Sequence, residues 1–220
     1  MLKAVIFDMD GVLLDSEPLW NRVEAQVFKK IGVPITGKMC LQTTGMRIDR
    51  SIDYWHNKFP WKTPSKEKVG QMILTKTIDL IKKEGKLNPG VTKLINFLLK
   101  NKIKIGLASS TPTSMINTTL KILGIHHHFE IIHSAENEIH PKPHPDVFLT
   151  AAQKLKVKPP VCLVIEDSPV GIIAAKRAGM KCVAVVDQRI QKDKSYGLAD
   201  YKLDSLNEFT EELWSKINSN

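Results

Sequence analysis

The chain has 220 residues, a formal net charge of +9 at pH 7 and 42% hydrophobic residues, which suits one domain, or one domain carrying an insertion, with a substantial core. No apolar run approaches the roughly 18 residues of a membrane-spanning helix, and the lysines are scattered instead of gathered with aromatic residues in one patch. We therefore expect a cytoplasmic protein with no membrane and no nucleic-acid partner.

Short runs rich in β-branched residues recur along the chain with helical stretches between them. They are LKAVIFD from Leu2, KIGLAS from Lys104, EIIHSA from Glu130, VCLVIED from Val161 and KCVAVVD from Lys181. Each run is apolar at consecutive positions, as a strand covered on both faces must be. The pattern predicts an α/β fold in which a parallel sheet is flanked by helices.

One interval, residues 17–87, breaks this rhythm because it contains no convincing strand. Apolar residues at helical spacing predict one helix from about Pro18 to Ile31, ending at Gly32, and another from Ser65 to Gly85. We therefore expect a catalytic core formed by residues 1–16 and 88–220, with residues 17–87 inserted as a helical cap.

Cysteine and histidine do not predict a transition-metal centre. The cysteines are odd in number and lack CxxC spacing, which favours reduced buried thiols over disulfides. Three consecutive histidines cannot all face one ion from regular structure, so a polar loop is favoured over a metal cluster. The residues concerned are Cys40, Cys162 and Cys182, and His126 to His128 with His133, His140 and His144.

Polar residues follow several of the predicted strands. In open α/β sheets, ligands bind beyond the carboxyl ends of the strands, where loops from different strands converge. We therefore expect one site to contain the polar groups that stand at those ends and the lysine that precedes a later helix: Asp8, Asp10, Ser109, Ser110, Thr111, Lys142, Glu166 and Asp167.

The carboxylates in this set need compensating charge. Any one of them could simply cap a helix or a turn, but four converging in a partly dry cleft would repel unless cations neutralise them. Lys142 supplies one positive charge, and Mg²⁺ would supply the rest. A magnesium ion held by carboxylates favours phosphoryl chemistry over a purely structural role.

Four segments carry a resemblance to a known family. In chain order they are DMDGVLLDS from Asp8, the run ending in ASST, KPHPD from Lys142 and IEDS from Ile165. They resemble the four motifs of the haloacid dehalogenase superfamily, and the chain looks like a phosphatase of its β-phosphoglucomutase-like branch. The resemblance implies a Rossmann-like parallel sheet core with a helical cap inserted after the first motif.

The resemblance also implies roles for individual residues. Asp8 would attack phosphorus and form an aspartyl-phosphate, and Asp10 would protonate the leaving oxygen and then deprotonate water. True dehalogenases lack an aspartate at the position of Asp10, so dehalogenation is not expected. The phosphoryl oxygens would be bound by Ser109, Ser110 and Lys142. The implied Mg²⁺ ligands are the Asp8 carboxylate, the Asp10 backbone carbonyl and Asp167, with Glu166 in support through water.

The substrate class follows from the cap motifs. The related mutases carry a histidine where this chain has Trp20, and a KGxxR-like loop where it has TTGMR ending at Arg47. The segments TTGMRID, FPWKTPS and ASSTP look instead like sugar phosphatases that act on 2-deoxyglucose 6-phosphate and hexitol phosphates. We expect a monomeric, Mg²⁺-dependent phosphatase of small phosphorylated metabolites, with Arg47 contacting the substrate. A phosphosugar mutase and a basic binding protein on the same fold are the alternatives.

Overall fold

The structure is a computed structural model that describes residues 1–219. Its centre is a sheet of six parallel strands in the order β3-β2-β1-β4-β5-β6. The five predicted strands are present, and a sixth short strand was not predicted. The strands are β1 (Ala4–Phe7), β2 (Lys104–Ser109), β3 (Ile131–Ser134), β4 (Cys162–Glu166), β5 (Lys181–Val185) and β6 (Tyr201–Leu203).

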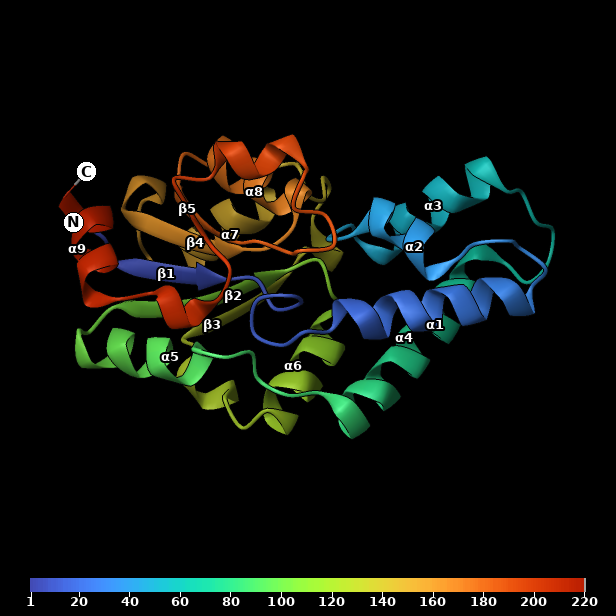
Figure 1. Ribbon diagram of the computed structural model, residues 1–220, viewed down its shortest axis with the longest axis horizontal. Coiled ribbons are helices and arrows are strands. Elements are labelled where there is room, and N and C mark those ends of the chain that lie inside the picture. Colours follow the sequence, from blue (N-terminus) through green and yellow to red (C-terminus); the bar gives the residue numbers. More distant parts are fainter. Residues whose placement is uncertain (220) are drawn as a thin grey trace.

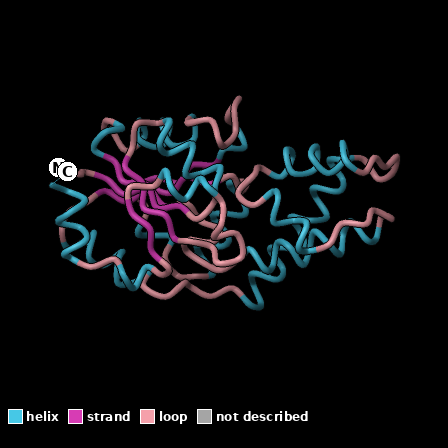
Figure 2. The backbone as a smooth tube through the Cα atoms, turned by 45° about the horizontal axis from the view of Figure 1, so that its top comes forward, coloured by secondary structure: helices cyan, strands magenta, loops and turns pink. Residues whose placement is uncertain are grey.

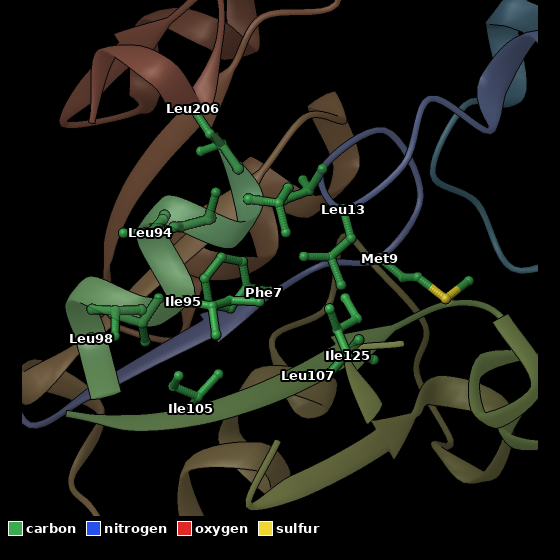
Figure 3. Close-up of a cluster of buried hydrophobic side chains, with 14 of the residues drawn as sticks. Phe7, Met9, Leu13, Leu94, Ile95, Leu98, Ile105, Leu107, Ile125 and Leu206 are labelled. Carbon is green, nitrogen blue, oxygen red and sulfur yellow. The ribbon is translucent and has the colours of Figure 1, made fainter. Parts of the chain in front are cut away.

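Helices cover both faces of the sheet (Figure 1). One face carries α5 (Val91–Lys100), α6 (Thr113–Ile122) and α9 (Glu211–Ser219), and the other carries α7 (Asp146–Lys154) and α8 (Pro169–Arg177). Successive residues of β1 alternate between the two cores, as the period of a strand requires. Phe7 packs with Leu94, Ile95 and Leu98 of α5 (Figure 3), whereas Ile6 packs on the opposite side. The predicted α/β class with a Rossmann-like parallel sheet is confirmed.

Four α-helices project from one end of this layered body (Figures 1 and 2). They are α1 (Glu17–Lys30), α2 (Gly37–Cys40), α3 (Ile48–Lys58) and α4 (Lys66–Glu84). The helices predicted from Pro18 and from Ser65 correspond to α1 and α4, and the Ser65 side chain caps α4 by accepting from the Lys68 backbone N–H.

The projecting helices share a hydrophobic core of their own, which includes Val27, Phe28, Trp55, Val69 and Ile73. A separate core of this kind is expected of a cap that folds as a unit. The exact domain boundaries, 17–87 against 1–16 and 88–220, stay a prediction.

Short 3₁₀ helices join several elements: Leu41–Thr43, His126–His128, Ala135–Asn137, Pro159–Val161, Lys194–Leu198 and Leu206–Glu208. Within residues 1–219, no helix is long and apolar enough to cross a membrane. The cysteines are free and buried, as the sequence predicted.

The register of the sheet brings the polar strand ends to one edge. Phe7 of β1 is level with Leu107 of β2 and with Ile165 of β4. The residues that follow these three therefore emerge together at the carboxyl edge, beside the start of α1 (Figure 1). This edge and the cap helices enclose the candidate site.

Candidate active site

A buried lysine joins the carboxylates that follow β1 and β4. Lys142 Nζ donates hydrogen bonds to Asp8 Oδ1 and to Glu166 Oε1, both at 2.6 Å, and its side chain is 1% exposed. Burial lowers the pKa of Lys142, but the attraction of the two carboxylates outweighs burial and leaves it above its ordinary value. The lysine is therefore charged, as two buried carboxylates require.

Asp8 is held at the end of β1. Its backbone N–H donates to Ile165 O at 2.9 Å, which continues the pairing between β1 and β4. Burial raises the pKa of its carboxyl to about 7, because desolvation and the charges of Glu166 and Asp10 together exceed the opposing effect of Lys142. A cation close to the second oxygen of Asp8 would favour the ionised form that a nucleophile needs.

Both carboxylate oxygens of Glu166 are hydrogen-bonded by groups of the protein. While Oε1 accepts from Lys142, Oε2 accepts from the Asp167 and Ser168 backbone N–H groups, each at 2.8 Å, and from Ser168 Oγ at 3.0 Å. A Cβ at Gly171 would lie 1.7 Å from Glu166 Oε1, so only glycine leaves room for this carboxylate. The geometry makes Glu166 a support for Lys142, and its predicted role toward a metal stays a prediction.

Asp167 differs from Glu166 because one of its oxygens lacks a partner. Oδ2 is buried and has no hydrogen bond within the described part of the chain. Burial, followed by the charges of Glu166, Glu17 and Asp8, raises the pKa of Asp167 well above its ordinary value. Gly11, at φ +73°, approaches so closely that a Cβ there would lie 1.8 Å from Oδ2. The missing side chain at Gly11 therefore leaves room for Asp167 Oδ2. This buried oxygen still needs a hydrogen-bond donor or a cation.

The oxygens around Asp167 fit a magnesium ion. Hard cations prefer carboxylate and carbonyl oxygens, and Mg²⁺ combines one or two carboxylates with water and substrate phosphate. The unpartnered Asp167 Oδ2, the Asp8 carboxylate and the Asp10 backbone carbonyl, which the sequence predicted as ligands, are all oxygen donors. The residues present therefore suit Mg²⁺, because they offer oxygen ligands and because Asp167 Oδ2 has no hydrogen-bond partner among the described residues.

The Asp10 side chain is fixed by three donors from two different parts of the chain. Oδ1 accepts from Ser16 Oγ at 2.6 Å and from Trp20 Nε1 at 2.9 Å, and Oδ2 accepts from Thr111 Oγ1 at 2.6 Å. Trp20 lies on α1, so a cap residue orients a core carboxyl group. The sequence left the role of Trp20 open, since nothing in the spacing indicated this bond.

The two serines after β2 have different surroundings. Ser109 is 1% exposed, and its Oγ accepts from the Thr111 backbone N–H at 3.2 Å while lying in the same cavity wall as Asp8. Ser110 Oγ donates to the Gly45 carbonyl at 2.9 Å and so connects the core to the cap. Both serines line the cavity, and their predicted contact with phosphoryl oxygens stays a prediction.

Arg47 lies away from the predicted contact with substrate. Its Nε and Nη2 donate to the two carboxylate oxygens of Asp49 at 2.7 and 2.8 Å, and its Nη1 donates to the carbonyls of Ala135 and Glu138, both at 2.8 Å. These bonds connect the cap to the loop after β3, and Arg47 does not line the cavity. The geometry does not support the substrate contact, which the sequence inferred from a motif alone.

A cavity between the core edge and the cap contains about 580 Å³ of space, part of it open to solvent. Its core wall holds three of the four catalytic candidates, Asp8, Asp10 and Ser109, together with the rest of the loop after β2. The other walls come from α1 and from the segment around α2 and α3: Glu17, Trp20, Asn21, Glu24, Cys40, Thr43, Thr44, Gly45, Met46, Ile48 and Ser51.

Sequence reasoning missed two acidic residues in this cavity, Glu17 and Glu24, which are only 6% and 7% exposed. Burial raises the pKa of Glu17 to about 8, with the charge of Asp10 adding to the effect. Burial raises the pKa of Glu24 to about 7, against a small opposing effect of its hydrogen bond with the Cys40 thiol. Acids seven residues apart on an amphipathic helix usually indicate a solvated face, so nothing in their spacing indicated this burial.

The histidines lie outside the cavity. His126 to His128 form a 3₁₀ helix, and His140 and His144 each place Nδ1 near the Asp146 carboxylate, at 3.3 and 2.8 Å. The ligand atoms of this surface group lie within 4.8 Å of one another. It is exposed and separate from the acids at the sheet edge.

This fold and this site define a class: a capped α/β hydrolase whose acids and buried lysine stand at the carboxyl edge of a parallel sheet. The family model of the haloacid dehalogenase-like hydrolases matches residues 5–185. The chain belongs to that family, as the four sequence motifs predicted.

The chain is also similar to individual proteins of known name. The chain is 40% identical over 210 residues to hexitol phosphatase B of Escherichia coli (strain K12), covering 95% of each chain. It is 29% identical to a phosphorylated carbohydrates phosphatase of Thermotoga maritima, covering 88% of this chain and 89% of the relative. A β-phosphoglucomutase structure from Clostridium difficile superposes with a TM-score of 0.84 at 29% identity, covering 98% and 96% of the two chains. Within the family, the two phosphatases among these relatives place the chain with the phosphoric monoester hydrolases.

Proposed function

We propose that this protein hydrolyses small sugar or sugar-alcohol monophosphates, namely hexose or hexitol phosphates and 2-deoxyglucose 6-phosphate, with Mg²⁺ and through an aspartyl-phosphate. The observation that carries the proposal is the buried ion pair set of Asp8, Lys142 and Glu166, with Lys142 Nζ 2.6 Å from each carboxylate. A charged lysine beside a nucleophilic carboxylate suits the binding of a phosphoryl group, whose oxygens carry the negative charge.

The residues that would hold Mg²⁺ are Asp8, the carbonyl of Asp10 and Asp167, whose Oδ2 has no partner in residues 1–219. When bound, the ion would neutralise the crowded carboxylates and the phosphoryl oxygens. Glu166 would support the site by holding Lys142, because its own oxygens are already hydrogen-bonded.

In the first step, a carboxylate oxygen of Asp8 would attack phosphorus and the bond from phosphorus to the sugar oxygen would break. Asp10 would give a proton to that leaving oxygen, and afterwards take one from the water that hydrolyses the aspartyl-phosphate. The bonds from Ser16, Trp20 and Thr111 fix Asp10 so that the same carboxyl group can serve both steps. Ser109 and Lys142 would bind the phosphoryl oxygens.

The substrate class is supported by the 40% identity to a hexitol phosphatase and by the cavity itself. Hydroxyl, amide and carboxyl groups line the cap wall of this cavity. Such a lining suits a polyhydroxylated leaving group.

The proposal further assigns the enzyme to the cytoplasm as a monomer that acts on dissolved metabolites and binds neither nucleic acid nor membranes. Three buried free cysteines suit a reducing compartment. The oligomeric state is measurable by sedimentation of the purified chain.

A phosphosugar mutase is the second candidate, because a β-phosphoglucomutase shares the fold at a TM-score of 0.84. A mutase must bind a second phosphate. The cap residues that line this cavity include no lysine, arginine or histidine, and Lys142 of the core is already paired with Asp8 and Glu166. The phosphatase reading is therefore favoured.

The test is release of inorganic phosphate from sorbitol 6-phosphate, 2-deoxyglucose 6-phosphate and an aryl phosphate, with Mg²⁺, with EDTA, and after Mg²⁺ is restored. We expect turnover that EDTA abolishes and Mg²⁺ recovers. In a parallel assay, β-glucose 1-phosphate with a catalytic amount of glucose 1,6-bisphosphate should give little glucose 6-phosphate. Efficient isomerisation would favour the mutase, and activity that persists in EDTA would contradict the metal dependence.

A further inference from the structure

The cap wall of the cavity contains polar groups that the protein leaves nearly unpartnered. Glu24 is 7% exposed, and the Cys40 thiol beside it also has the Thr36 carbonyl as an acceptor, at 3.3 Å, so its single hydrogen cannot serve both groups at once. Ser51 is 3% exposed, and its Oγ has no partner in the same part of the chain. Both residues line the cavity. Buried polar groups are normally satisfied, so these two indicate a ligand that brings its own donors and acceptors.

The polar residues of α1 form a single stripe that faces this cavity. Glu17, Asn21 and Glu24 follow the spacing i, i+4 and i+7, which places them on one side of a helix. Val23, Val27 and Phe28 of the same helix pack in the core of the cap. The helix therefore presents hydrogen-bonding groups along the length of the cavity instead of the apolar side chains that a packed helix would present.

The stripe has a reacting end and a far end. Trp20 Nε1 contacts Asp10, which marks the position of the leaving oxygen. Glu24 lies one turn further from the sheet edge, about 6 Å along α1 at 1.5 Å per residue. An extended six-carbon chain with bonds of about 1.5 Å spans about 6 Å from its first to its last carbon, whereas a three-carbon chain spans less than half of that.

The charge of the cavity restricts what the far end can bind. Glu17 and Glu24 are acidic, and none of the described lining residues carries a basic side chain. A second phosphate at the far end would meet carboxyl groups and no cation, which is unfavourable for a dianion. Neutral hydroxyl groups can donate to Glu24 and both donate to and accept from Ser51.

We infer that Glu24 and Ser51 form a recognition site for the terminal hydroxyl groups of a six-carbon polyol monophosphate, at the end of the cavity opposite Asp8. The inference rests on the proposed function and names the residues that select chain length and reject bisphosphates. These residues bind the substrate far from phosphorus and take no part in the proton transfers at Asp10.

The test compares sorbitol 6-phosphate with its analogue lacking the terminal hydroxyl, with glycerol 3-phosphate and with an aryl phosphate, in wild type, Glu24→Leu and Ser51→Ala. We expect wild type to prefer sorbitol 6-phosphate over the deoxy analogue by about tenfold in kcat/KM, and each variant to lose most of that preference. Activity on glycerol 3-phosphate and the aryl phosphate should change less than about twofold, because neither substrate reaches the far end.

Glu67→Gln, which alters an exposed acid of the cap, is the matched control and should keep the preference. Should Glu24→Leu fold poorly, as a thermal melt would reveal, Ser51→Ala and Glu24→Gln provide the same comparison. Equal losses on all four substrates, or no preference for the terminal hydroxyl in wild type, would overturn the inference alone. Failure of wild type to hydrolyse any of the phosphomonoesters would instead reject the proposed function and this inference with it.

Discussion

The core wall and the cap wall of the cavity differ in how fully their polar groups are hydrogen-bonded. On the core wall, Asp10 has three donors, and Lys142 binds both Asp8 and Glu166. On the cap wall, Glu24 shares the single hydrogen of the Cys40 thiol with the Thr36 carbonyl, and Ser51 Oγ has no partner among the described residues. Groups that must react are held in one geometry before substrate arrives, whereas groups that recognise substrate are left to be satisfied by it.

The core wall depends most strongly on Asp8. Asp8→Asn keeps the shape of the side chain but removes the nucleophile, so we expect kcat to fall by at least about 10⁴-fold on every substrate. The melting temperature should be unchanged or higher, because the substitution removes one negative charge from a crowded acidic site. Phosphate release and thermal melts measure the two effects, and substantial turnover in a well-folded variant would contradict the covalent mechanism.

Substitution of Asp10 should affect substrates differently according to their leaving group. Asp10→Asn should lower kcat/KM for a sugar phosphate by about 100-fold but lower that for an aryl phosphate by much less, because only the sugar alkoxide needs a proton as it leaves. Since the expected metal contact of this residue is its backbone carbonyl, Mg²⁺ affinity should be preserved, and a metal titration controls for damage to the site. Equal losses on both substrates would remove the general-acid role.

Gly11 and Gly32 offer a matched pair for the space around Asp167. Both have positive φ, +73° and +77°, but a Cβ at Gly11 would lie 1.8 Å from Asp167 Oδ2, whereas a Cβ at Gly32 would contact nothing within 4 Å. Gly11→Ala should raise the Mg²⁺ concentration for half-maximal activity by about tenfold or more, while Gly32→Ala should alter it less than twofold. Similar effects of the two variants would show that backbone strain, not the position of Asp167, limits metal binding.

The cap wall can be tested through stability. Burial raises the pKa of Glu24 from an ordinary value of 4.5 to about 7, so between these values the folded state binds more protons than the unfolded state. The free energy of unfolding therefore falls as pH rises through this window. Glu24→Gln should stabilise the protein by about 2 kcal/mol at pH 8, and the difference from wild type should vanish as the pH falls well below the ordinary value of 4.5.

Urea unfolding at several pH values measures this difference. The exposed Glu67→Gln is again the control. Hydrogen bonds at the start of α4 lower the pKa of Glu67, so its loss of charge should not stabilise the protein at pH 8. A constant difference between Glu24→Gln and wild type across the pH range would mean that Glu24 is not protonated by burial.

Much of the core could be predicted because its signals are local. The apolar runs that form β1 to β5 are visible in the sequence, and the parallel sheet brings their carboxyl ends together without further information. Asp8, Glu166 and Lys142 could therefore be placed in one site. β6 spans only Tyr201–Leu203, and three residues carry no period that distinguishes a strand from a loop.

The cap wall could not be predicted because its properties depend on tertiary contacts. Glu17 and Glu24 look like residues of a solvated helix face, although both are buried in the folded chain. Arg47 matches a substrate-binding motif approximately, but the Ala135 and Glu138 carbonyls that accept its hydrogen bonds come from a loop almost ninety residues away. Burial and partner choice of this kind follow from packing and not from spacing.

Helix α1 serves both walls, since it carries Trp20, which orients Asp10, and Glu24, which faces the far end. An α-helix turns by about 100° per residue, so one residue inserted between these two positions would turn Glu24 away from the cavity or turn Trp20 away from Asp10. Evolution and protein engineering can therefore change the substrate of this scaffold through substitutions on α1, but not through insertions or deletions within it. Enzymes descended from this chain should vary in the residues of the stripe while keeping the length of the helix between them.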